Sequence, residues 1–72
     1  MDDSLRKTLI ANATSNIGLA TQYIGNLNLC DDIQHLSTEI EWILIELKCA
    51  CSNLETYKSM LAEEYATKAD TN

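Results

Sequence analysis

The stretch "EIEWILIELKCAC", residues 39–51, decides the fold of this 72-residue chain. As a helix it would be apolar on almost every side, because Trp42 and Ile45 face one side and Ile43 and Leu47 another. A chain of this length builds only a small core, so such chains lean on disulfides, metals or association. The stretch therefore predicts a helix that needs more than one apolar neighbour.

A seven-residue repeat runs through two segments of the chain. Apolar residues from Ile33 to Leu61, and again from Ile10 to Leu27, alternate spacings of three and four. Sustained over several heptads, this spacing is typical of coiled-coil seams. The residues expected to form the core between the two helices are Ile10, Ile17, Ile24, Ile33, Leu36, Ile40, Ile43, Leu47 and Leu54.

A single turn signal separates the two segments. Gly25 suits the residue just after a helix, and Asp31 and Asp32 are good N-caps, with Gln34 placed as in a capping box after Asp31. The sequence thus predicts one all-α domain, a two-helix antiparallel hairpin with coiled-coil-like heptads that associates into a bundle. We expect a helix over about residues 4–25, a connection over 26–31, a helix over 32–66 and a frayed tail over 67–72.

Two features indicate a partner chain. A second apolar stripe on the longer helix, around Trp42, faces away from the main seam. The longer helix should also extend roughly 20 Å beyond the shorter one, which leaves its end without an intramolecular neighbour. The residues predicted to bind a partner are Trp42, Ile45, Cys49, Tyr57, Met60, Leu61 and Tyr65.

The charge and the cysteines restrict the kinds of partner and compartment. A net charge of −6 disfavours nucleic acid and anionic lipid, because both need clustered Lys and Arg. Residues 8–30 carry no charge, but five Asn and Gln side chains and two glycines argue against membrane insertion. Three cysteines are too few for a disulfide framework, and the acidic start lacks the features of a signal peptide. We expect a reducing, cytoplasmic compartment.

No pattern of reactive side chains indicates an enzyme, a metal site or a cofactor. Cys49 and Cys51 diverge by about 200° on a helix, so they cannot share one metal ion. His35 is the only histidine and lacks the orienting partners that catalysis needs. The carboxylate pairs, at residues 31–32 and 63–64, fit a helix cap and a solvated surface.

The stripes Ile10-Ile17-Ile24 and Ile33-Ile40-Leu47-Leu54, in an acidic hairpin without proline, resemble the small hairpin subunits of type III secretion needle-protein chaperones. The resemblance covers the whole chain in architecture and includes no diagnostic motif. It implies a subunit that pairs with a repeat-type co-chaperone and keeps the needle protein unpolymerised in the bacterial cytoplasm. The chain is also similar in architecture to homodimeric hairpins of the plasmid copy-number regulator type, whose RNA-binding function the acidic charge opposes.

Three functions remain open at this point. The first is a small cytoplasmic chaperone or adaptor subunit that binds another protein through its longer helix, with Trp42 as an anchor. The second is a homo-oligomeric structural or regulatory helical bundle of four-helix type, phage or plasmid encoded. A third, an acidic mimic of nucleic acid, is disfavoured because apolar faces interrupt the acidic residues.

Overall fold

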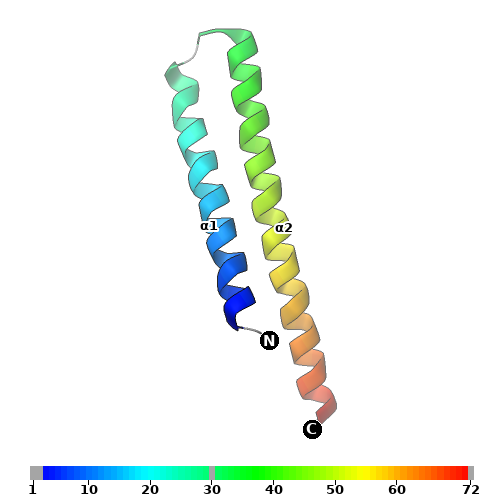
Figure 1. Ribbon diagram of the computed structural model, residues 1–72. Helices are drawn as coiled ribbons and strands as arrows, with labels where there is room; N and C mark the ends of the chain where they lie inside the picture. Colours follow the sequence, from blue (N-terminus) through cyan, green and yellow to red (C-terminus); the bar gives the residue numbers. More distant parts are fainter. Residues whose placement is uncertain (1–2, 30, 72) are drawn as a thin grey trace.

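The structure, a computed structural model, describes residues 3–29 and 31–71, and their side chains as far as Thr67. Two α-helices, α1 (Asp3–Asn26) and α2 (Ile33–Thr71), are joined through a 3₁₀ turn, η1 (Leu27–Leu29). The two helices lie side by side and run in opposite directions (Figure 1). The predicted all-α two-helix hairpin is confirmed.

The helix ends differ from the prediction in two places. Gly25 lies inside α1, which ends at Asn26, and no described glycine has a positive φ, so Gly25 does not terminate the helix in a left-handed conformation. The expected frayed tail is helical as far as Thr71, and α2 continues past the start of α1 (Figure 1). Cys30 in the connection and Asn72 at the end lie outside the described residues.

Asp32 caps the start of α2. Its Oδ1 accepts a hydrogen bond from the backbone N–H of Gln34 at 3.2 Å, and its carbonyl accepts the first helical bond from the N–H of Leu36 at 2.9 Å. A side-chain oxygen that binds the N–H two residues on satisfies one of the unpaired donors of a helix start. The cap is therefore Asp32, not Asp31 with a capping box to Gln34.

Loss of this cap should destabilise the hairpin. We expect Asp32→Ala to lower the free energy of unfolding by about 1 kcal/mol, because the Gln34 N–H loses its acceptor. Urea unfolding followed by circular dichroism at one protein concentration measures the change. Asp31→Ala is the matched control and should leave the free energy within about 0.5 kcal/mol of wild type. Equal losses in both variants would contradict the assignment of the cap.

The contact between the helices follows a different phase of the heptad from the expected one. With heptads lettered so that Ile10 and Ile40 occupy position a, the residues that α1 and α2 bury against each other lie at positions d and g. The buried residues, which are 2–8% exposed, are Leu9, Ala13, Ala20, Glu39, Ile43 and Ala50.

Most of the expected hairpin core is instead on the surface. Of the nine residues, Ile43 is buried and Leu36 and Leu47 are half-buried. The other six are 45–82% exposed in the hairpin, which corrects the expectation that they fill the space between α1 and α2; these are Ile10, Ile17, Ile24, Ile33, Ile40 and Leu54.

Small side chains explain why positions d and g make this contact. Three of the d positions hold alanine, namely Ala13, Ala20 and Ala50, and two of them are only 2% exposed. The distance between two packed helices depends on the size of the side chains at the contact. Alanines at d let the backbones come close, and the larger isoleucines at a are then turned outward. The hairpin is a single layer of helices, with extents of 60 × 17 × 12 Å.

Candidate protein-interaction surface

Polar side chains connect the two helices in the middle of the seam. The Nδ2 of Asn16 on α1 donates to Oε1 of Glu46 on α2 at 2.7 Å. The Nδ2 of Asn53 donates both to Oδ1 of Asn16 at 3.2 Å and to the carbonyl of Cys49 at 3.0 Å. This partly buried network places Asn16 level with the stretch of α2 between Glu46 and Asn53, and so fixes the register of the hairpin.

Glu39 is a buried carboxylate nearer the turn. The residue is 7% exposed, and Oε2 has no hydrogen-bond partner. Oε1 lies 3.4 Å from Nε2 of the more exposed His35, one helical turn earlier on α2. A buried carboxylate with one unpaired oxygen lowers the stability of the fold. It gives up its hydrogen bonds to water and regains only some of them in the protein.

One side of the hairpin carries a continuous set of exposed aliphatic side chains from both helices, which we name the apolar face. Seven of its members are 44–53% exposed, Ile33 is 82% exposed and Leu47 is half-buried. All but Leu44, at position e, are a residues. The apolar face consists of Ile10, Ile17 and Ile24 on α1 and Ile33, Ile40, Leu44, Leu47, Leu54 and Leu61 on α2.

The two helices contribute to this face together. Ile10 and Ile17 of α1 line the same shallow groove as Leu54 of α2, with Ala13 at its floor and a volume of about 330 Å³. A second, smaller hollow on the same side lies between Leu54 and Lys58. The hairpin therefore has a shallow apolar groove between its two helices on this side.

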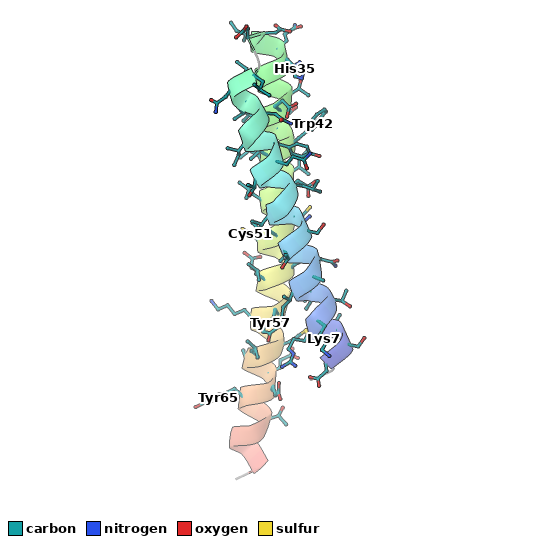
Figure 2. All side chains as sticks on the ribbon, turned by 90° about the vertical axis from the view of Figure 1, so that its left-hand side faces the viewer. Lys7, His35, Trp42, Cys51, Tyr57 and Tyr65 are labelled. Atoms are coloured by element: carbon teal, nitrogen blue, oxygen red, sulfur yellow. The ribbon has the colours of Figure 1, made fainter. Side chains whose placement is uncertain are left out.

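An aromatic pair occupies the opposite side of the hairpin. The rings of Tyr23 on α1 and Trp42 on α2 lie 5.8 Å apart with a tilt of 52°, a favourable geometry for aromatic side chains. With Ile45 and Glu46 they line a hollow of about 200 Å³. Figure 2 views the hairpin from the side of α1, and Trp42 and Cys51 lie on opposite sides of it.

The residues predicted to bind a partner fall in three different places. Trp42, Ile45 and Cys49 are exposed on the side opposite the apolar face. Tyr57 and Met60 are half-buried and continue the d and g positions of the seam, so they are less open to a partner than expected. Leu61 belongs to the apolar face, and Tyr65 is 78% exposed beyond it (Figure 2).

Some side chains of the seam and of its edges were not among the predicted site residues. Tyr23 and the three members of the polar network were not singled out, although Asn16, Glu46 and Asn53 all recur at position g. A polar residue at one heptad position of a predicted seam is the signal that indicates an interhelical hydrogen bond. Two such asparagines on opposite helices were therefore detectable as candidates.

The described residues bring no reactive group together. Among them, no cluster of three or more His, Cys, Asp or Glu side chains could hold a metal ion. Cys49 and Cys51 are free thiols on the surface. Within the same part of the chain, neither helix combines the length and the hydropathy that crossing a membrane requires.

No protein-family model, curated protein or solved structure matches the chain.

Proposed function

We propose that the protein is a non-enzymatic association subunit that covers apolar helical surface, as chaperone and adaptor subunits do. The apolar face is the surface that binds. The observation that carries this proposal is the position of Ile10, Ile17 and Ile24 on the same side as the aliphatic a residues of α2, all partly open to solvent.

The exposed residues keep a strict helical repeat, which supports a helical partner. Isolated exposed leucines are ordinary on protein surfaces and need no partner. Here, however, the a residues recur every seven residues over 10–24 and over 33–61, as they do where helices interlock. A continuous apolar surface of this kind marks an interaction site.

The direction in which the apolar face points also supports further helices as its binding partner. On each helix the centre of the a and e positions lies about 110° around the axis from the centre of d and g. One helical neighbour occupies d and g in the hairpin. A second neighbour would lie in a direction roughly perpendicular to the first, seen down the helix axis. This is the arrangement of a four-helix bundle, in which each helix packs on two others.

Charge supports a protein partner over a role as an acidic mimic of nucleic acid. The carboxylates of α2 lie at positions b, c, d and g, and none lies at the a or e positions between 33 and 61. Two charged side chains, Glu55 and Lys58, line the hollow near Leu54. Lys58 is at an e position, and Glu55 lies at the outer edge of the apolar face. Charged groups are depleted from the centres of protein interfaces in the same way.

A photo-crosslinking residue placed on the face tests the proposal. We expect the photoreactive phenylalanine analogue at position 17 or 54, in cells that express the chain, to form a covalent adduct with another polypeptide. The analogue at position 15 or 52, on the outward side of each helix, should form little adduct. Mass spectrometry of the adduct identifies the chain that lies on the face.

Two comparisons complete this experiment. Introducing Leu54→Asp into the chain with the analogue at 17 should abolish the adduct, because a carboxylate in an apolar contact is costly to bury. Adducts of equal yield from positions 15 and 17, or none from either, would refute the apolar face as the binding surface.

A further inference from the structure

We infer that the partner on the apolar face is a second copy of this chain, packed with its turn at the opposite end to form an antiparallel four-helix bundle. This inference rests on the proposed function and names the occupant of the same face. Four features of the chain carry it: the area left exposed, the symmetry of the apolar face, the charge within that face and the distribution of charge along the hairpin.

The first feature is the size of the uncovered surface. The hairpin exposes 5516 Å², whereas a compact protein of 8.0 kDa exposes about 4,450 Å². The excess of roughly 1,000 Å² is close to the 800 Å² or so that each partner buries in a stable interface. The radius of gyration of 17.2 Å likewise exceeds the value of about 11 Å for a compact chain of 72 residues. A single layer of helices leaves one apolar face uncovered, and a second layer of similar size would cover it.

The second feature is the symmetry of the apolar face. On α1 its a residues extend one heptad to either side of Ile17, and on α2 they extend two heptads to either side of Leu47. These two centres lie nearly level, because Asn16 bonds to both Glu46 and Asn53. A two-fold axis across the helices at this level therefore maps the apolar face onto itself. Self-complementarity of this kind is what a symmetric dimer requires.

The third feature is the charge within the face. Identical chains repel each other wherever the same carboxylates meet, and this chain has eleven acidic residues. The a positions from 10 to 24 and from 33 to 61 hold only isoleucine and leucine, and no e position of either helix holds an acid. A second copy can thus approach this face without bringing carboxylates together at its centre.

The fourth feature decides the direction of the second copy. Residues 17–47, which form the half of the hairpin that includes the turn, contain five acidic residues and no lysine or arginine. The remaining residues contain six acidic and five basic residues, so this end is almost neutral. Turns at the same end would place two acidic halves together, whereas turns at opposite ends place each acidic half beside a balanced one.

The mass in solution tests the dimer. We expect light scattering and sedimentation equilibrium of the purified chain to give twice the 8.0 kDa of one chain at micromolar concentration. Leu54→Asp should raise the dissociation constant roughly a hundredfold or more, because the dimer would bury two unpaired carboxylates. Ile45→Asp is the matched control, since Ile45 and Leu54 are 52% and 53% exposed on the same helix. It should change the dissociation constant by less than about threefold.

Crosslinking between two tagged chains tests the direction. In a background with serine in place of all three cysteines, one chain carries Ile40→Cys and the other Leu54→Cys. A short thiol crosslinker should join these two chains to each other, because positions 40 and 54 lie symmetrically about Leu47 on facing α2 helices. Turns at the same end would instead bring position 40 close to position 24 of the second copy. A crosslink between Ile40→Cys and Ile24→Cys chains, without one between 40 and 54, would overturn the antiparallel arrangement.

The results also separate this inference from the proposed function. A helical monomer whose photo-crosslinker at position 17 still joins a different protein would overturn the second copy and leave the binding face in place. A helical monomer with no adduct from the face would overturn both. If circular dichroism shows that the Leu54→Asp chain is unfolded, dilution of the wild-type chain measures the dissociation constant directly. A wild-type chain that is monomeric at all micromolar concentrations would refute the dimer.

Discussion

Ile43→Ala should lower the free energy of unfolding by about 2–5 kcal/mol, the cost of removing a large aliphatic side chain from a core. Ile43 is one of only two large aliphatic side chains that are buried among the described residues, the other being Leu9. The hairpin has few other contacts of this size, so the loss is large relative to the total stability of so small a domain. Urea unfolding at a fixed protein concentration, followed by circular dichroism, measures it.

Ile45→Ala provides the matched control for this variant. Ile45 is the same residue type on the same helix, two positions away, but it is 52% exposed. We expect the control to change the free energy of unfolding by no more than about 0.5 kcal/mol. Equal losses from the two variants would mean that the seam through Ile43 does not hold the hairpin together.

Glu39→Leu should have the opposite effect and raise the free energy of unfolding by about 1–3 kcal/mol, the cost of leaving a polar group buried and unsatisfied. Glu39 is buried between α1 and α2, and its Oε2 has no partner. Leucine has a similar volume and needs no hydrogen-bond partner. Removal of the carboxylate also takes away the contact of His35, but His35 is exposed enough to be solvated by water. Thermal and urea unfolding of the two chains give the difference.

Glu41→Leu separates this effect from a general gain in hydrophobicity. Glu41 lies two residues further along α2 and is exposed. Leucine there gains little burial, so the free energy of unfolding should stay within about 0.5 kcal/mol of wild type. A Glu39→Leu chain that is less stable than wild type would show that the carboxylate is satisfied in solution, for example by a polar group of a partner.

Several parts of the fold were predictable because they depend on short-range interactions. The seven-residue spacing of apolar residues and the absence of proline indicated two helices, and the polar stretch before Ile33 indicated a helix start. Helix periodicity and capping involve residues within one or two turns of each other. The exact ends of the helices were less predictable. The choice of Asp32 over Asp31 as the cap, for example, depends on the conformation of the connection.

The candidate site was only partly predictable. The sequence indicated uncovered apolar surface around Trp42, and that residue is indeed 46% exposed beside Tyr23. It did not indicate that the larger uncovered surface is the a stripe around Ile17 and Leu54, which was assigned to the hairpin core. Spacing alone does not distinguish these two roles, because both stripes of a helix in a bundle repeat every seven residues.

The sequence by itself determined that this chain forms two helices of unequal length, each with a seven-residue apolar repeat and more apolar surface than one neighbour covers. Only the tertiary structure decided which stripe faces the other helix. The alanines at d allow the close approach of α1 and α2, and Asn16 bonds across to Glu46 and Asn53. Both effects join residues about thirty or more positions apart in the chain, so no local pattern specifies them; they arise when the two helices pack and turn Ile10, Ile17 and Ile24 outward.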